Sequence, residues 1–352
     1  MNTFSERLKS ARLKAGLSLR SLAEELGTIS FQALGQYEKG MYFPDSEKLA
    51  KLCKVLNVRP DYFTREQLFD LGEVSFRKLK SHPEKDNKQL IEETRDYVER
   101  FAELKEFVGE NAGSYKKELK RIPVLSIEEA EHAANKLRVQ WKMGDSPITN
   151  LTDLLEDKGF MVLEVEAKQE VDGLSTFIDS IQQPVIVVNK AKQVIIERKR
   201  FTIAHELAHL ILEIPAETKK DVEERWCNRF AAAFLLPKTS VFNELGQKRK
   251  KILQYEMEVL KTEYGISVPA IVYRLFDLGI FTTYDMQYWM KHLDQIGYRS
   301  TSEPSKFKGE EVPRRFDQLI VRCLAEEFIT VSKAAALCNL SVSAFRDKYL
   351  KI

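Results

Sequence analysis

The sequence of 352 residues has few cysteines and no long apolar run. The four cysteines form no C-x-x-C pair, which argues against a disulfide framework and against a cysteine-based zinc cluster. No stretch is long and apolar enough to cross a bilayer, and the first residues hold no apolar signal core. The sequence therefore predicts a cytoplasmic protein that neither enters a membrane nor is secreted.

The charges of the chain nearly cancel, with 55 Lys and Arg against 53 Asp and Glu. This balance excludes a global field that would attract nucleic acid or a membrane surface, so any basic patch must be local. Residues 1–60 hold ten Lys and Arg against six Asp and Glu. A local positive excess is therefore expected at the amino-terminal end.

Apolar residues recur at helical spacing through residues 4–63 and predict four or five short helices with a core of their own. Ser18 and Ser30 stand where N-caps are needed, and Gly27 stands where the first of two helices should end. The segment therefore predicts two short helices joined by a tight turn.

Residues 76–120 are rich in charge and carry a narrow apolar stripe. They predict a connecting helix too charged to belong to a core, with its stripe covered by the next domain or by a second chain. Beyond residue 126, two helices, three short β-rich runs and two longer helices follow, and the chain is helical from there to Ile352. A small sheet is implied.

One of these longer helices contains His205, Glu206 and His209, the pattern H-E-x-x-H. An offset of four residues places both imidazoles on one face of a helix, where one zinc ion can bind them. Glu206 can then take a proton from water as a general base. The next helix offers Glu223 or Glu224 as a third ligand. The alternative is a pair of helix histidines satisfied by carboxylates.

Residues 173–237 resemble the ImmA/IrrE family of zinc metallopeptidases. The resemblance rests on the strings GLSTF, PVIVVN, RKRFTIAHELAHLIL and EERWCNRFAAAFLLP, with Cys227 and Leu236 as mild departures. It implies that Glu224, four residues before Asn228, completes the zinc site. In that family, peptidases cleave partner repressors.

Residues 4–63 resemble the Xre-type (lambda-repressor-like) helix-turn-helix family, through RLKSARLKAGLSLRSLAEELG, QYEKG and FPDSEKLAKLCKVLNV. In such domains the second helix of the pair enters the major groove of DNA. The resemblance implies base contacts from Ser30, Phe31, Gln32 and Gln36, and phosphate contacts from Arg20 and Lys39. The alternative is a bundle kept for partner binding or dimerisation.

The expected fold class is mainly α with a small β-sheet. It comprises a helix-turn-helix bundle (1–70), a helical linker (71–121), a zincin-like α+β peptidase domain (122–240) and a helical carboxy-terminal region (241–352). We expect a regulator that binds double-stranded operator DNA, with a homodimer as the base-rate expectation for readers of this kind. We also expect a Zn²⁺-dependent endopeptidase that cleaves a repressor-type protein or itself. The alternative is a transcription factor whose peptidase-like domain senses a ligand, metal or partner without cleaving.

Overall fold

The amino-terminal bundle contains helices α1 (Thr3–Lys14), α2 (Leu19–Leu26), α3 (Phe31–Glu38) and α4 (Ser46–Val55), followed by the 3-10 turn η1 (Pro60–Thr64). In the computed structural model the described residues are 3–65, 84–109, 121–165, 172–179, 181–190, 195–249, 251–298, 303 and 305–350. The Ser18 hydroxyl accepts a hydrogen bond from the Ser21 amide, and the Ser30 hydroxyl accepts one from the Ala33 amide. Gly27 ends α2 in the left-handed conformation. These caps confirm the two helices expected from the sequence, and the bundle has its own apolar core around Leu8, Leu22, Leu34 and Leu52.

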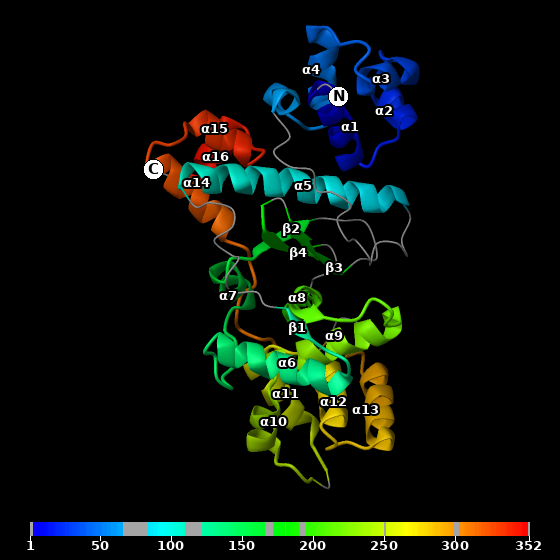
Figure 1. Cartoon of the computed structure of the whole chain (residues 1–352), viewed down its shortest axis with the longest axis vertical. Coiled ribbons are helices and arrows are strands. Elements are labelled where there is room, and N and C mark those ends of the chain that lie inside the picture. Colours follow the sequence, from blue (N-terminus) through cyan, green and yellow to red (C-terminus); the bar gives the residue numbers. More distant parts are fainter. Residues whose placement is uncertain are drawn as a thin grey trace.

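A small sheet occupies the middle of the molecule (Figure 1), with the strand order β2 (Met161–Val165), β4 (Gln183–Asn189) and β3 (Gly173–Ile178). Strand β4 is parallel to β2 and antiparallel to β3, with Ser175 opposite Ile186. The sequence predicted these three strands. Because side chains alternate along a strand, β4 contributes Ile186 and Val188 to one core and Val185 and Val187 to another.

The core on one side of the sheet is formed mainly by helices α6 to α13. Their bounds are α6 (Ile127–Gln140), α7 (Leu151–Asp157), α8 (Ile196–Ile211), α9 (Lys220–Leu235), α10 (Lys238–Leu245), α11 (Gln254–Tyr264), α12 (Val268–Asp277) and α13 (Thr283–Gln295). A short parallel pair, β1 (Ile122–Pro123) with β5 (Leu212–Glu213), follows the end of α8. Helices α8 and α9 lie side by side here and confirm the two longer helices expected from the sequence.

The core on the opposite face of the sheet is formed by α5 (Glu84–Phe107) and by the last three helices, α14 (Arg315–Ala325), α15 (Val331–Leu337) and α16 (Val342–Tyr349). Leu90, Val98, Phe101 and Leu104 of α5 are buried in it. The prediction that this charged helix belongs to no core is therefore wrong. Its apolar stripe is covered by the sheet and by α14 to α16. The remainder of the predicted linker, residues 71–83 and 110–120, lies outside the described part of the chain.

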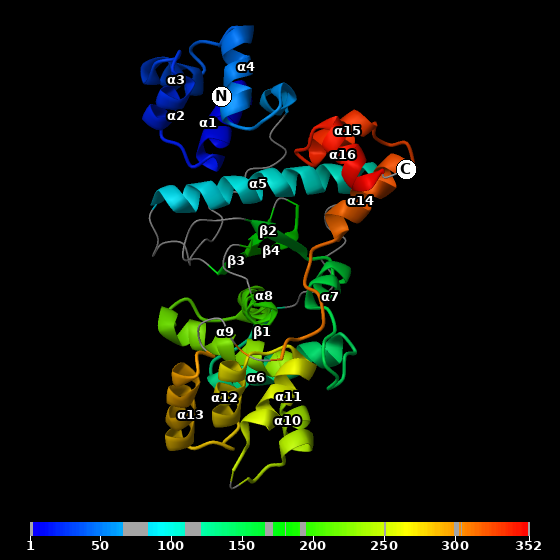
Figure 2. The same ribbon diagram turned by 180° about the vertical axis from the view of Figure 1, so that it is seen from behind.

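Helix α5 runs between the sheet on one side and the amino-terminal bundle on the other, as both views show (Figures 1 and 2). Helices α15 and α16 lie near the carboxy-terminal end of α5. The packing thus divides the predicted carboxy-terminal region, because α10 to α13 join the core around α8 while α14 to α16 join the core around α5.

The segment between α13 and α14 is anchored to α7 and α8 through Glu311, whose side chain has no exposed surface. Glu311 accepts hydrogen bonds from the Leu151 and Thr152 amides at the start of α7, at 2.9 and 2.7 Å, and pairs with the buried guanidinium of Arg200 from α8. Every helix in the described part of the chain is too short or too polar to cross a membrane.

Candidate metal centre

The H-E-x-x-H pattern lies within α8, and the core against which this helix packs holds both histidines in place. His205 and His209 are one turn apart, so their side chains leave the same face of α8, and their Nε2 atoms lie 3.2 Å from each other. Ile203, Leu207 and Leu210 on other faces of the helix are buried in the core. The apolar residues therefore fix which way the two imidazoles point.

Glu224 reaches this pair from the adjacent helix α9. Its Oε2 lies 3.2 Å from His205 Nε2, and its Oε1 lies 3.7 Å from His209 Nε2. One ligand atom from each of the three residues lies within 4.8 Å of the others. Glu223, the other carboxylate offered by the sequence, faces the opposite ring atom, 3.3 Å from His209 Nδ1.

The second nitrogen of each imidazole has a partner of its own. His205 Nδ1 lies 2.8 Å from Asn228 Oδ1, and His209 Nδ1 is close to Glu223 and to the buried Cys227 sulfur, 3.5 Å away. Because an amide oxygen only accepts, we assign the proton of His205 to Nδ1. Its Nε2 then carries a lone pair toward Glu224, so the donor set fits a divalent metal bound by two imidazoles and one carboxylate.

Glu206 stands outside this group of three, on a side of α8 that faces the sheet. Its side chain is buried and its Oε2 accepts a hydrogen bond of 2.8 Å from Ser175 Oγ in strand β3. Gly173, two residues earlier on the same face of β3, lies so close that a Cβ there would be 3.3 Å from Glu206 Cγ and 2.7 Å from Thr202 Cγ2. Strand β3 therefore approaches α8 closely at Gly173 and reaches the Glu206 carboxylate with Ser175.

Sequence reasoning missed Ser175 and Gly173 as parts of the site. Both belong to the GLSTF string, and the signal was their alternation: two small residues at positions i and i+2 of a predicted strand share one face. Strand β3 is also the edge of the described sheet, beside α8. An edge strand offers backbone groups that can pair with an extended peptide.

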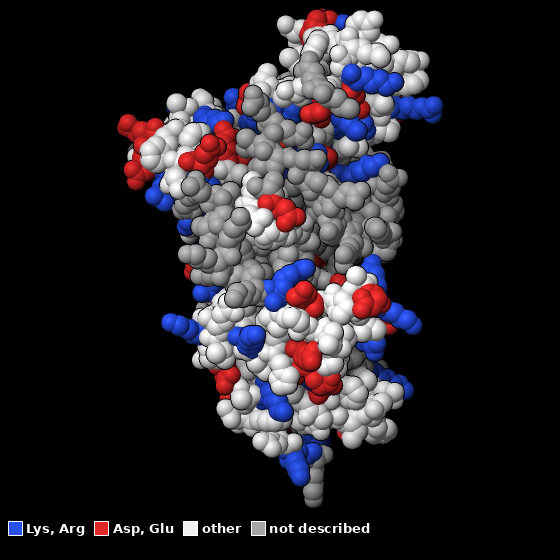
Figure 3. All heavy atoms as spheres, in the orientation of Figure 1, with Lys and Arg blue, Asp and Glu red and all other residues white. Residues whose placement is uncertain are grey.

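The six residues predicted for DNA contacts all lie at the surface of the helix-turn-helix bundle: Arg20, Ser30, Phe31, Gln32, Gln36 and Lys39. The Arg20 guanidinium lies over the Phe31 ring, 5.6 Å from its centroid, and so joins the start of α2 to the start of α3. A Cβ at Gly35 would only touch Leu19 at 3.9 Å, so packing does not require a glycine inside α3. Figure 3 shows several Lys and Arg side chains over this end of the molecule.

Two segments of the chain match known protein families. Residues 8–63 match the helix-turn-helix family, and residues 155–276 match the family of IrrE N-terminal-like domains, which is a metallopeptidase family. The chain is also similar to the HTH-type transcriptional regulator ImmR of Bacillus subtilis (strain 168), with 34% identity over 119 residues. That stretch covers 34% of this chain and 89% of the relative.

Proposed function

Because the chain belongs to the family of helix-turn-helix transcriptional regulators that includes ImmR, and joins that domain to an IrrE N-terminal-like domain, we propose that it is a DNA-binding regulator carrying a zinc-dependent endopeptidase. The DNA-binding unit is residues 1–70. The peptidase unit begins at residue 122, and we place α10 to α13 with it because they share its core.

Double-stranded operator DNA is the proposed partner of the amino-terminal unit. The exposed residues at the start of α3, Phe31 and Gln32, would face the bases, while Arg20 and Lys39 would contact phosphates. Ser30 combines two roles, because its oxygen caps α3 while its hydroxyl hydrogen can still be donated.

His205, His209 and Glu224 would hold the metal, and zinc suits this set of two imidazoles and one carboxylate. When bound, zinc would supply Lewis-acid polarisation of the scissile carbonyl and of the attacking water. Glu206 adjoins the first ligand but is not itself in the donor set, so its carboxylate is placed to accept the proton of that water and to return it to the leaving amine. Ser175 holds Glu206 Oε2 and thereby fixes the plane of the carboxylate.

The single observation that carries this proposal is the separation of roles within one helix: two ligand imidazoles converge on Glu224, while the intervening Glu206 is buried, lies outside the donor set and is held by Ser175. A purely structural zinc site would not need a buried carboxylate between its ligands. The edge of β3 beside α8 suits an extended segment of a protein substrate, and we propose a repressor-type protein or the chain itself.

The test combines metal content with intact mass over time, for the zinc-loaded chain alone and with a purified helix-turn-helix repressor. We expect wild type to hold zinc and to generate fragments, His205→Ala to lose the zinc, and Glu206→Gln to keep the zinc but stop the cleavage. Glu213→Gln, which changes an exposed glutamate just after α8, serves as the matched control.

Equal cleavage by wild type and Glu206→Gln would remove Glu206 from the mechanism. Undiminished stoichiometric zinc in His205→Ala would contradict the ligand assignment. Stoichiometric zinc without cleavage of either substrate, together with DNA affinity that changes with zinc, would instead support the alternative of a non-cleaving sensor.

A further inference from the structure

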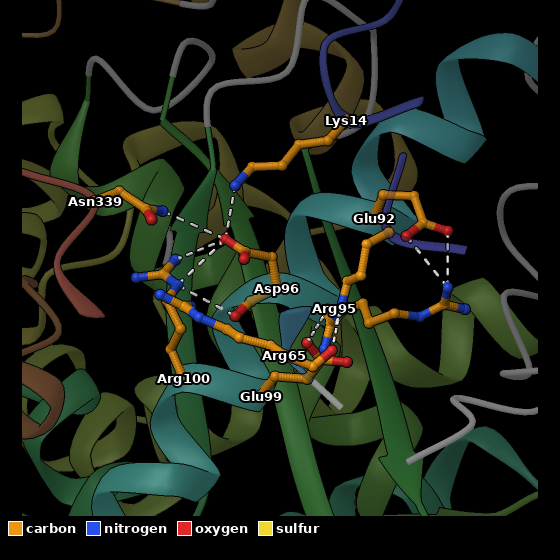
Figure 4. A network of polar contacts seen from close by, with 9 residues as sticks. Lys14, Arg65, Glu92, Arg95, Asp96, Glu99, Arg100 and Asn339 are labelled. Carbon is orange, nitrogen blue, oxygen red and sulfur yellow. Dashed lines mark hydrogen bonds and ion pairs between the residues drawn. The ribbon is translucent and has the colours of Figure 1, made fainter. Parts of the chain in front are cut away.

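The helix-turn-helix bundle contacts α5 through two ion pairs, one buried and one partly exposed. Arg7 of α1 lies 2.5 Å from Glu99, with 5% and 7% of the two side chains exposed. Lys14, the last residue of α1, lies 2.6 Å from Asp96 (Figure 4), with 25% and 4% of the two side chains exposed. Two cations of the DNA-binding domain are therefore neutralised by carboxylates of the helix that covers the peptidase sheet.

Asp96 also binds the carboxy-terminal helices. Arg100 lies 3.2 Å from the same Asp96 oxygen and donates a hydrogen bond of 2.7 Å to the Leu337 carbonyl, while Asn339 Nδ2 donates to Asp96 at 3.4 Å. Burial alone would raise the pKa of Asp96, but Arg100, Lys14 and Asn339 together lower it to about 2. One ionised carboxylate thus connects α1, α5 and the turn between α15 and α16.

The contact between the bundle and α5 leaves one buried polar atom without a hydrogen bond. Glu99 Oε1 is buried and accepts no hydrogen bond from the described residues, and burial raises the pKa of Glu99. The bundle keeps its own apolar core, of which α5 is not a part. Because desolvation offsets much of the attraction in a buried ion pair, a docked and an undocked arrangement can be close in free energy.

The docked helix lies beside the end of the bundle that would meet DNA phosphates. A Cβ at Gly16, in the turn between α1 and α2, would be 2.9 Å from Gln89 Oε1 of α5. Gln89 in turn donates a hydrogen bond of 3.0 Å to Glu93. Two residues after Gly16, Ser18 caps α2, the helix whose amino-terminal end carries Arg20.

A phosphate at the start of α2 would therefore approach the part of α5 that carries Gln89 and Glu93. The helix N-terminus and Arg20 would attract the phosphate, but the Glu93 carboxylate and the bulk of α5 oppose it. Among residues 88–107, α5 carries six carboxylates and four cations: Glu92, Glu93, Asp96, Glu99, Glu103 and Glu106, with Lys88, Arg95, Arg100 and Lys105.

We propose that α5 is an autoinhibitory docking site for the DNA-binding domain: the Arg7–Glu99 and Lys14–Asp96 pairs hold the bundle in a state of low DNA affinity, and DNA binding requires its release. The proposal rests on DNA binding by residues 1–70 and is independent of peptidase activity. The apparent association constant for DNA is then the intrinsic constant of the undocked state multiplied by the fraction of molecules that are undocked.

The test uses the full chain and a fluorescein-labelled duplex of mixed sequence, about two helical turns long, with binding measured by anisotropy at low salt. Glu99→Gln and Asp96→Asn each remove a charge on α5 and leave every residue of the bundle unchanged. Both should bind the duplex at least about tenfold more tightly than wild type, which corresponds to about 1.4 kcal/mol. Glu103→Gln is the matched control, because Glu103 lies on the same helix but pairs with Lys333 of α15, at 2.5 Å.

A charge exchange separates release from a general change in charge. Arg7→Glu combined with Glu99→Arg restores a pair of opposite sign and should return DNA affinity toward that of wild type. Affinities of Glu99→Gln and Asp96→Asn equal to or below that of Glu103→Gln, in proteins whose circular dichroism is native, would overturn the proposal. Absence of DNA binding by wild type and by every variant would overturn DNA binding itself.

Hydrogen exchange of the wild-type chain keeps the proposal testable if the variants fail to fold. Adding the duplex should increase deuterium uptake in residues 88–104 of α5, because release exposes the helix surface that the bundle covers. Unchanged or decreased uptake there at saturating DNA would contradict autoinhibition.

Discussion

Replacing Asn228 by alanine should weaken zinc binding without removing a ligand. Asn228 Oδ1 lies 2.8 Å from His205 Nδ1 and is the acceptor that fixes the imidazole with Nε2 available to the metal. Loss of such an outer partner typically costs about 10- to 100-fold in metal affinity, or about 1.4 to 2.7 kcal/mol. Because Asn228 is exposed, water can replace its oxygen, and we expect a loss near the lower limit.

The measurement is a competition titration of zinc against a chromogenic chelator at constant pH. Asn228→Asp retains an acceptor and adds negative charge, so it should bind zinc at least as tightly as wild type. Asp221→Asn is the control on the same helix, since Asp221 is exposed and pairs only loosely with Arg225, at 3.8 Å. If Asn228→Ala binds zinc within about twofold of wild type, Asn228 does not orient His205 and our assignment of the tautomer is wrong.

Three further predictions concern stability. Gly173→Ala should destabilise the fold by about 1–3 kcal/mol in urea unfolding, because the new Cβ would lie 2.9 Å from the Val187 carbonyl, whereas Gly35→Ala should stabilise it by about 0.5–1 kcal/mol; equal effects would refute the close packing at β3. Glu311→Gln should cost about 3–5 kcal/mol because it leaves the buried Arg200 charge uncompensated, and the exposed Glu310→Gln should change stability by less than about 0.5 kcal/mol; similar small effects would disprove the role of this pair. Burial, opposed by the Arg314 and Arg315 amides and assisted by Asp153, raises the pKa of Glu156 to about 7 in total. The folded state therefore binds more protons than the unfolded state, and stability should fall as pH rises from about 4.5 to 7. Glu156→Gln should reduce this fall, and an unchanged pH dependence would exclude Glu156 as its source.

Local chemistry accounts for the features that the sequence predicted well. Ser18, Gly27 and Ser30 define the ends of α2 and the start of α3 through side-chain caps and one left-handed glycine, all within a few residues of chain. The spacing of His205 and His209 likewise determines that both imidazoles share one face of α8. Both inferences depend on helix geometry alone, which explains why the sequence could supply them.

Contacts between distant segments account for what the sequence did not predict. The charge of α5 suggested a helix outside any core, yet Asp96 and Glu99 are buried because Lys14 and Arg7 lie opposite them, 82 and 92 residues away in the chain. The hydrogen bond from Ser175 to Glu206 likewise spans 31 residues. Neither kind of pairing has a local signal, since the first depends on how α1 packs on α5 and the second on how β3 packs on α8.

The packing of the bundle on α5 brings part of the positive and negative charge of the chain together in space. The amino-terminal bundle has a positive excess, but the docked state places two of its cations, Arg7 and Lys14, against carboxylates of α5. DNA meets the field of the whole docked surface and not the charge counted along residues 1–60, because carboxylates that are close in space offset the attraction over a distance of about one Debye length. The electrostatic strength of the DNA-binding domain is therefore set by its docking as well as by its composition, and a release from α5 would increase that strength without any change in sequence.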